Sequence, residues 1–270
     1  MKVFKFGGAS LKDAAGVQNV ASILQRFSDE KIVIVVSAMG KTTNALEEVV
    51  AAYVKQTGEA QALYDAFKER HYAIMRDLFD ASDEVFTIIN DTFVEGEWML
   101  EEKPSDNYDY LYDQIVCMGE LVSSKIVGAY LNKVNLKTTW LDARDVVATD
   151  NTYREGWVIW EKTQANAQKI VPPLFEQGNF VITQGFIGST SENFTTTLGR
   201  EGSDYSASIF SFCLNAESMS IWKDVAGVLN ADPRLFENTI KLDRLSYREA
   251  IEMTYYGASV IHPKTIKPLQ

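Results

Sequence analysis

Residues 1–36 read MKVFKFGGASLKDAAGVQNVASILQRFSDEKIVIVV, and this opening stretch decides the fold class. A strand-like run at 3–6 is ended by two glycines, and residues 13–27 place apolar side chains on one face at helical spacing. The unbroken apolar run at 31–36 is typical of a strand that is buried on both faces of a parallel sheet. A strand, a helix and a strand in this order predict a right-handed βαβ unit.

The rest of the chain continues this alternation around one long helical stretch. Residues 45–131 hold few glycines or prolines and predict several helices, with breaks near Gly58, 81–82 and 103–107. The later elements that we expect are strands at 136–141, 180–183 and 218–222, and helices at 163–177 and 203–214. A capping box, Ser246 followed by Glu249, predicts the start of a last helix, and Gly257 predicts its end.

This order of elements predicts a three-layer α/β/α sandwich with a mainly parallel central sheet. No internal repeat and no linker divides the sequence, so we expect one domain over residues 1–270. The helical stretch, at about 45–131, would be an insertion in that domain.

Composition narrows the class of protein. Acidic residues outnumber basic residues by 37 to 26, and the net charge of −11 argues against nucleic acid or an anionic membrane as a partner. The longest apolar run, near 32–39, is too short to cross a bilayer, and the first residues lead directly into a strand, so no signal peptide is expected.

The only two cysteines, Cys117 and Cys213, are expected to be buried, reduced thiols of a cytoplasmic protein. A homodimer is compatible with the sequence.

The first segment that carries chemistry joins the first strand to the first helix. Lys5 lies near the end of the strand, and Gly7 and Gly8 open the loop that follows. Backbone without side chains can approach a polyanion closely and offer it N–H groups, and a lysine adds a point charge at the same place. A plain turn with a solvated lysine explains this segment equally well.

A second segment, residues 198–206, runs from a glycine-rich loop into a helix. Gly199 and Gly202 let the backbone bend, and Asp204 falls in the first helical turn, where N–H groups lack partners. Arg200 offers a planar fork of donors that suits a carboxylate. A simple helix cap is the alternative role for Asp204.

Two further segments give weaker indications of function, and two familiar nucleotide-binding motifs are excluded. Polar turns at 222–228 and 232–234 follow a strand at the end where open α/β sheets bind ligands, although a surface loop fits them too. Glu120 lies among small residues in a helix, either at a helix contact or in a cleft.

The run from Gly40 to Thr42 lacks the earlier glycine of a Walker A loop, and 185–188 does not match a dinucleotide fingerprint.

Taken together, these segments resemble the aspartokinase branch of the amino acid kinase family. The matches follow the family's order from residue 2 to about residue 268, and the loop at 199–205 is the most specific of them. They comprise Lys5 to Ser10, Val36 to Met39 with Thr43-Asn44, Gly119-Glu120, Gln184 to Phe186, Leu198 to Tyr205, Trp222 to Val225, Asp232 to Arg234, and Tyr256 to Pro263.

The resemblance implies that the chain uses ATP and Mg²⁺. Lys5 would neutralise charge on the phosphoryl group in transfer, and Asp204 would orient Lys5 and take part in the network around magnesium and phosphate. No residue is implied as a direct metal ligand. The residues implied in nucleotide binding are Lys5, Gly7, Gly8, Ser10, Ser37, Lys223, Asp224, Leu229, Asp232 and Arg234.

The implied acceptor is the side-chain carboxylate of L-aspartate, in the first step towards lysine, threonine and methionine. Arg200 would bind the α-carboxylate of aspartate, and Glu120 its ammonium group. The remaining pocket residues would be Thr43, Phe186 and Ser203. A carboxylate is already anionic at neutral pH, so no general base is required.

Three positions depart from the family pattern. Ala9 stands where threonine is usual, Lys223 where threonine is common, and Ser259 where a lysine near the ATP phosphates is frequent. Lys264 is close to position 259 in the sequence and is a candidate to replace the missing lysine. Family members usually continue into paired regulatory domains, which we expect to be absent from this chain, together with feedback by lysine or threonine.

Other functions stay open from the sequence alone. A kinase for glutamate, acetylglutamate or a nucleoside monophosphate is the nearest alternative, although Glu120 and Thr43 favour an acceptor with a free ammonium group. A catalytically silent nucleotide-binding module is favoured only by the departures at positions 9 and 259, and no feature points to a structural subunit. The retained Lys5, Arg200 and Asp204 favour an enzyme.

Overall fold

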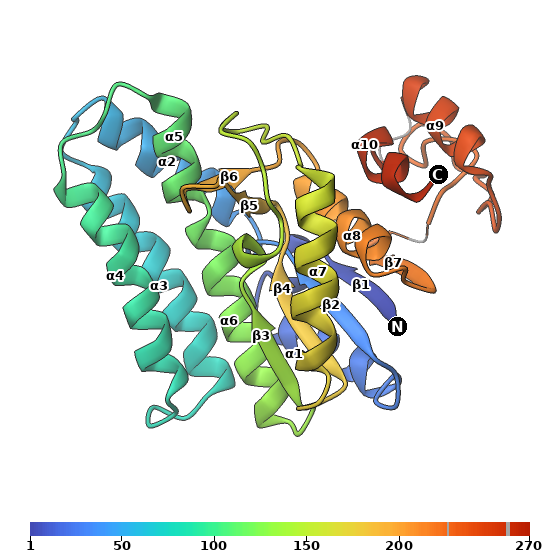
Figure 1. Ribbon diagram of the computed structural model, residues 1–270, viewed down its shortest axis with the longest axis horizontal. Helices are drawn as coiled ribbons and strands as arrows, with labels where there is room; N and C mark the ends of the chain where they lie inside the picture. Colours follow the sequence, from blue (N-terminus) through green and yellow to red (C-terminus); the bar gives the residue numbers. More distant parts are fainter. Residues whose placement is uncertain (226, 258–259) are drawn as a thin grey trace.

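A computed structural model describes residues 1–225, 227–257 and 260–270. Within them, the central sheet has five parallel strands in the order β3-β4-β2-β1-β7 (Figure 1). The strands are β1 (Lys2–Phe6), β2 (Ile32–Val36), β3 (Thr138–Leu141), β4 (Phe180–Gln184) and β7 (Ser218–Trp222). β2 is buried along its whole length, as its unbroken apolar run predicts. The parallel strands therefore present their carboxyl ends at one edge, where sheets of this kind bind ligands.

Alternate residues of the strands contribute to two separate cores, one on each face of the sheet. Phe4 and Ile34 belong to the core that includes residues of α1 and α6, whereas Val3 and Val33 belong to the core that includes residues of α7 and α8. The four helices are α1 (Ala14–Gln25), α6 (Met118–Lys133), α7 (Trp160–Leu174) and α8 (Gly202–Cys213). The predicted three-layer sandwich is therefore confirmed.

Four more helices stand beside the sheet, at the left of Figure 1. They are α2 (Thr42–Val54), α3 (Ala60–Leu78), α4 (Val85–Glu101) and α5 (Tyr108–Val116). The three predicted breaks fall between them, and Gly58 has a left-handed φ of +83°. The further break at Cys117, between α5 and α6, is not visible in the sequence because the apolar run continues through it.

The sequence pattern also does not predict a short antiparallel pair, β5 (Ile187–Ser189) and β6 (Thr195–Thr197). Each of these strands has three residues, too few for an alternating pattern to show. The pair matters for function because β6 packs beside α5 and Thr197 lines the main cavity.

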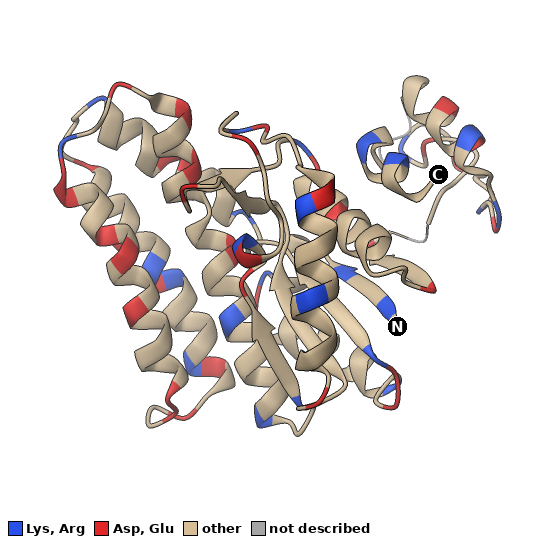
Figure 2. Ribbon diagram, in the orientation of Figure 1, with Lys and Arg blue, Asp and Glu red and all other residues tan. Residues whose placement is uncertain are grey.

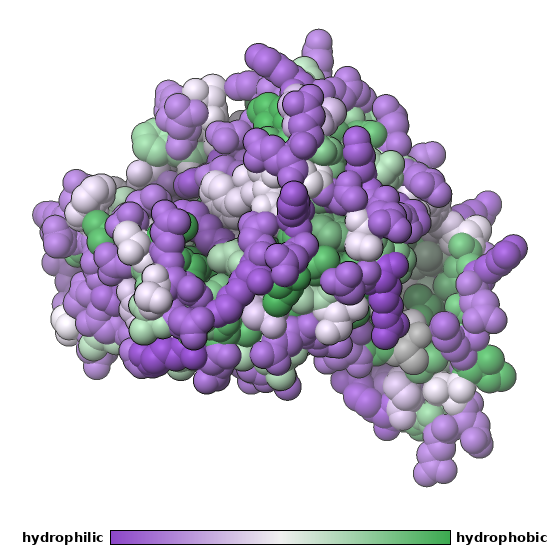
Figure 3. All heavy atoms as spheres, turned by 90° about the horizontal axis from the view of Figure 1, so that it is seen from below, coloured by the Kyte–Doolittle hydropathy of each residue, from purple (hydrophilic) through white to green (hydrophobic). Residues whose placement is uncertain are grey.

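The C-terminal segment contains α9 (Tyr247–Tyr255) and α10 (Pro263–Ile266). Ser246 and Glu249 form the predicted capping box, and Gly257 has the expected left-handed backbone, with φ of +104°. No residue of α9 is buried, and Figure 3 shows apolar side chains among those exposed at this end of the molecule. α9 is therefore less well packed than the sandwich, whereas Thr265 and Ile266 of α10 are buried.

Charged residues lie mostly on helices and loops rather than on the strands (Figure 2). Both cysteines are buried, as predicted. Within the described part of the chain, no helix combines the length and the apolar character that a bilayer span requires.

Candidate active site

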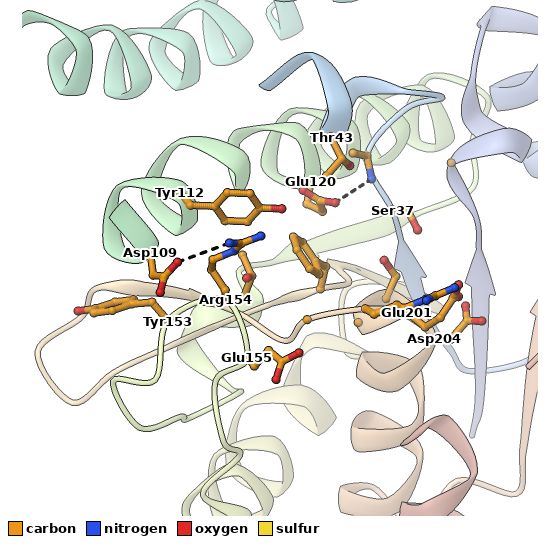
Figure 4. Close-up of a pocket in the computed structure, with 18 of the residues that line it drawn as sticks. Ser37, Thr43, Asp109, Tyr112, Glu120, Tyr153, Arg154, Glu155, Glu201 and Asp204 are labelled. Carbon is orange, nitrogen blue, oxygen red and sulfur yellow. Dashed lines mark hydrogen bonds and ion pairs between the residues drawn. The ribbon is translucent and has the colours of Figure 1, made fainter. Parts of the chain in front are cut away.

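A cavity of about 780 Å³ lies where the loops after β1 and β2 meet the start of α8. The predicted residues that line it are Lys5, Gly8, Ser37, Thr43, Glu120, Phe186, Arg200, Ser203 and Asp204. The fold therefore brings the two most informative segments of the sequence, residues 5–10 and 198–206, into one site. Figure 4 shows the side chains converging on it from α5, α6, α8 and the loops.

A buried carboxylate between two ammonium groups marks one wall of the cavity. Asp204 Oδ1 lies 2.6 Å from Lys5 Nζ, and Asp204 Oδ2 lies 2.9 Å from Lys223 Nζ. Burial acts to raise the pKa of the Asp204 carboxyl, but the two ammonium groups outweigh it and hold the pKa below its ordinary value. Two cations around one carboxylate leave an excess of positive charge, which suits an anionic phosphoryl group.

The loop after β1 fits closely against the loop after β2 because Gly8 has no side chain. A Cβ atom at Gly8 would lie 2.5 Å from the carbonyl oxygen of Ala38, and the Gly8 carbonyl accepts the N–H of Gly40 at 2.8 Å. Ser37 donates its N–H to the carbonyl of Phe6 at 3.2 Å. The glycine that the sequence assigns to phosphate binding therefore also has a packing role.

Glu120 reaches the cavity from the first turn of α6 and is 2% exposed. Its Oε1 accepts the N–H of Ala38 at 3.4 Å, while its Oε2 has no hydrogen-bond partner in the described part of the chain (Figure 4). Burial raises the pKa of this carboxyl to about 8. A buried carboxyl with a free oxygen at a cavity suits a cationic ligand group, whose charge stabilises the ionised form.

The loop before α8 bends through two left-handed residues, Gly199 with φ of +73° and Glu201 with φ of +55°. Gly202 then packs so closely on Phe186 that a Cβ atom would lie 2.6 Å from the Phe186 ring. This path leaves Arg200 exposed at the rim of the cavity.

Several predicted nucleotide-binding residues lie outside the main cavity: Gly7, Ser10, Lys223, Asp224, Leu229, Asp232 and Arg234. Asp232 and Arg234 pair with each other at 2.7 Å. Lys223 borders a second cavity of about 540 Å³, lined largely by apolar side chains of β7 and the C-terminal segment. The ion pair of Lys223 with Asp204 therefore stands between the two cavities.

Lys264, the candidate substitute for the lysine that the family often has at position 259, contacts the loop before α8 with its ammonium group. Its Nζ donates to the carbonyl of Leu198 at 2.7 Å and lies 4.8 Å from the centre of the Tyr205 ring. Lys264 therefore anchors the loop before α8. Ser259 itself lies outside the described residues, as do Ala226 and Ala258.

The sequence did not reveal one group of lining residues, carried by α5 and by the loop at 150–156. They are Asp109, Tyr112, Tyr153, Arg154 and Glu155 (Figure 4). Their two segments are joined by a hydrogen bond between positions 41 apart, from the N–H of Arg154 to Asp113 Oδ2. No spacing rule links such distant positions in one sequence, and no glycine marks the left-handed backbone of Arg154.

Comparison with known proteins assigns the chain that carries this site to a family. The whole chain, residues 1–270, matches the family model described as the amino acid kinase family. The chain belongs to this family. The fold and the resemblance seen in the sequence are thereby confirmed.

Among similar amino acid kinases, the bifunctional aspartokinase/homoserine dehydrogenase 1 of Arabidopsis thaliana is 34% identical, over 99% of this chain and 30% of that protein. Lysine-sensitive aspartokinase 3 of Escherichia coli K12 is 34% identical, over 98% of this chain and 58% of that protein. The crystal structure of E. coli aspartokinase III with aspartate and ADP has a TM-score of 0.88 at 30% identity, over 99% of this chain and 59% of that one. The chain thus spans only part of the length of these relatives.

Proposed function

We propose that this amino acid kinase is the catalytic part of an aspartokinase, which transfers the γ-phosphoryl group of ATP to the side-chain carboxylate of L-aspartate. One observation carries the proposal: a single cavity holds both the buried Glu120, with its free oxygen, and the Lys5–Asp204 pair. The first suits the ammonium group of an amino acid, and the second suits a phosphoryl group. The complex of a similar aspartokinase with aspartate and ADP supports this choice of substrates.

The acceptor carboxylate needs no proton removed, because it is ionised at neutral pH. One of its oxygens attacks the γ-phosphorus, an O–P bond forms, and the bond from phosphorus to the bridging oxygen breaks, so that ADP leaves with that electron pair. The product is 4-phospho-L-aspartate. Positioning and charge stabilisation carry most of such a reaction. Lys5 would stabilise the charge on the moving group, held in place by its 2.6 Å ion pair with Asp204.

The acceptor would be held by residues from three helices, α2, α6 and α8, and from two loops. Glu120 would bind the ammonium group of aspartate, and Arg200 the α-carboxylate. Thr43, Phe186 and Ser203 would complete the pocket, and their place on the cavity wall supports this role.

The nucleotide would extend from the loop after β1 towards the second cavity. Its phosphates would meet Gly7, Gly8, Ser10 and Ser37, with Lys223 beside them. Lys223 borders the second cavity, which supports this direction. The residues proposed to hold the rest of the nucleotide are Asp224, Leu229, Asp232 and Arg234, which do not line that cavity.

Mg²⁺ would enter with ATP. The described residues include no cluster of three or more His, Cys, Asp or Glu side chains that could hold a metal ion, and the oxygens of Asp204 already face two lysines. This fits a magnesium ion bound mainly by phosphate oxygens and water, which is how the ion is commonly held at nucleotide sites. When bound, the ion supplies further neutralisation of phosphate charge.

We also propose a cytoplasmic enzyme of the pathway to lysine, threonine and methionine, able to act as a homodimer and without nucleic-acid or membrane partners. The aspartokinase relatives support the pathway. The net charge of −11 supports the exclusion of anionic partners.

The test is trapping of the product. The chain is incubated with ATP, Mg²⁺, aspartate and hydroxylamine, which converts an acyl phosphate into a coloured hydroxamate, with glutamate and no acceptor as controls. We expect hydroxamate only with aspartate. A higher kcat/KM with glutamate would make the chain a glutamate-type kinase, and no hydroxamate with either acceptor would contradict the proposed reaction.

A further inference from the structure

Arg154 is a second guanidinium on the wall of the main cavity, and the proposed function does not yet use it. It belongs to the loop at 150–156 and lines the cavity together with Tyr112 of α5. Figure 4 shows its planar group beside the Tyr112 ring, on the part of the site that carries Glu120. The guanidinium carbon lies 4.4 Å from the centre of that ring.

The backbone of Arg154 is held firmly in an unusual conformation. Its φ is +67°, in the left-handed region that residues other than glycine rarely adopt. Its N–H donates at 2.9 Å to Asp113 Oδ2, which is fully buried and also accepts the N–H of Thr197 at 2.8 Å. Surroundings that impose a rare backbone conformation of this kind occur often at functional sites.

Asp109 and Tyr112 orient the side chain of Arg154 without using all of its N–H donors. Its ion pair with Asp109 is long, 3.6 Å from Nη1 to Oδ1, and both side chains are about half exposed, at 46% and 56%. The Tyr112 hydroxyl donates to Glu47 at 2.7 Å, which fixes the ring as a platform. A flat fork of donors, stacked on a fixed ring and facing a cavity, suits a carboxylate.

We propose that Arg154 is a specificity-determining residue that binds the non-reacting α-carboxylate of the acceptor, together with Arg200. This inference rests on the proposed function and deepens it. Two guanidinium groups on one carboxylate make the enzyme select acceptors that carry it, because an acceptor without that charge leaves both cations unpaired. The alternative is that Arg154 serves only to pair with Asp109 at the rim.

Arg154→Gly is the decisive variant. Glycine adopts the left-handed backbone without strain and keeps the N–H that bonds to Asp113, so the loop retains its anchor while the guanidinium is removed. Asp109→Asn is the matched control, because it removes the ion pair and leaves the guanidinium on Tyr112. Arg154→Lys keeps the charge but loses the fork.

The measurement is kcat/KM with aspartate and with its α-amide, which keeps the ammonium group and the reacting carboxylate. We expect Arg154→Gly to lower kcat/KM about ten- to hundredfold with aspartate, the usual effect of losing a charged hydrogen-bonded pair. With the α-amide the change should stay below about threefold, since the group that Arg154 binds is missing there. Asp109→Asn should stay near the wild type with both acceptors, and Arg154→Lys should fall between the wild type and Arg154→Gly.

Equal losses with the two acceptors, or a wild-type kcat/KM for aspartate in Arg154→Gly, would overturn the inference. Calorimetric titration with aspartate gives a readout without turnover, in which Kd should rise in Arg154→Gly and not in Asp109→Asn. If the wild type binds aspartate without phosphorylating it, the proposed function fails, and the titration still decides the role of Arg154. If the wild type binds neither aspartate, glutamate nor succinate, both proposals are wrong.

Discussion

Two buried carboxylates hold different walls of the cavity, and their neighbours move their pKa values in opposite directions. Asp204 on α8 is 1% exposed, and two ammonium groups hold the pKa of its carboxyl below the ordinary value despite burial. Asp113 on α5 is fully buried and receives uncharged donors, so burial raises the pKa of its carboxyl to about 6. Equal burial therefore has opposite consequences, depending on whether the neighbours are charged.

The opposite pKa shifts of Asp204 and Asp113 indicate two different roles within one site. Asp204 fixes two cations, so its own charge is needed. Asp113 fixes the backbone of Arg154 and of Thr197, so its shape and its acceptor atoms are needed more than its charge. Substitutions that keep shape and remove charge should therefore be costly at Asp204 and mild at Asp113.

The largest effect is expected at the partner of Asp204. Lys5→Ala should lower kcat about 10²- to 10³-fold, the typical loss when one preorganised group that stabilises transition-state charge is removed. The fold should survive, because Asp204 keeps its ion pair with Lys223 at 2.9 Å. Hydroxamate assays measure the rate, and urea unfolding serves as the control. A near-normal kcat would remove Lys5 from the phosphoryl-transfer step.

The charge of Asp204 itself is tested by Asp204→Asn. The free energy of unfolding should fall by about 3 kcal/mol at neutral pH, because the substitution leaves two ammonium groups facing each other without a counter-charge. The folded-state pKa of Asp204 is lowered, so its contribution is present above the ordinary carboxyl range and is lost as pH falls through the folded pKa. The gap between wild type and variant in urea unfolding should therefore narrow in acid. A variant as stable as the wild type at pH 7 would show that the charge of Asp204 is not needed for stability.

A smaller effect, with a clear pH signature, is expected at Glu120. The ionised carboxyl binds the ammonium group of the acceptor, so kcat/KM for aspartate should rise with pH up to the free-enzyme pKa of about 8 and then level off. Glu120→Gln should lower kcat/KM about tenfold or more at pH 8.5 and abolish this inflection. Initial rates across the pH range at fixed ATP give the profile. The same inflection in the Gln variant would assign it to another group.

The smallest effect is expected for Asp113→Asn. An amide oxygen can accept the N–H groups of Arg154 and Thr197, and the amide NH₂ can donate to the Thr197 hydroxyl that now lies 2.7 Å away. The folded-state pKa of about 6 is above the ordinary value of 3.8, so ionised Asp113 disfavours the folded state above pH 6, and this penalty fades as pH falls towards 4.

The Asn variant at position 113 should therefore match the wild type, or exceed it by up to about 1 kcal/mol at pH 7 to 8, with no advantage near pH 4. Urea unfolding at the two pH values measures this difference, and the KM for aspartate should change little. A loss as large as that of Asp204→Asn would show that both carboxylates are needed for their charge.

Prediction from the sequence succeeded where the signal was local. The run at 31–36 and the helical face at 13–27 predicted the βαβ unit. Lys5, Gly8 and Asp204 were chosen from short local segments, and the fold brings them to one cavity, while their roles stay proposals. Prediction failed where a feature depends on long-range packing.

The features that the sequence did not predict have separate physical causes. Arg154 faces the cavity only because a carboxylate 41 positions away holds its backbone, and the β5–β6 pair is too short for its period to show. The predicted Ser10, Asp232 and Arg234 were chosen by resemblance, and they lie outside the main cavity. Their roles stay proposals.

In the proposed complex, one cavity holds the ammonium group of aspartate on Glu120 and the transferred phosphoryl group beside Lys5. The most direct test is a crystal structure with aspartate, Mg²⁺ and a non-hydrolysable ATP analogue. We expect the ammonium group at about 3 Å from Glu120 Oε2 and a γ-phosphoryl oxygen at a similar distance from Lys5 Nζ. Aspartate bound away from Glu120, or terminal phosphate oxygens that do not approach Lys5, would contradict it.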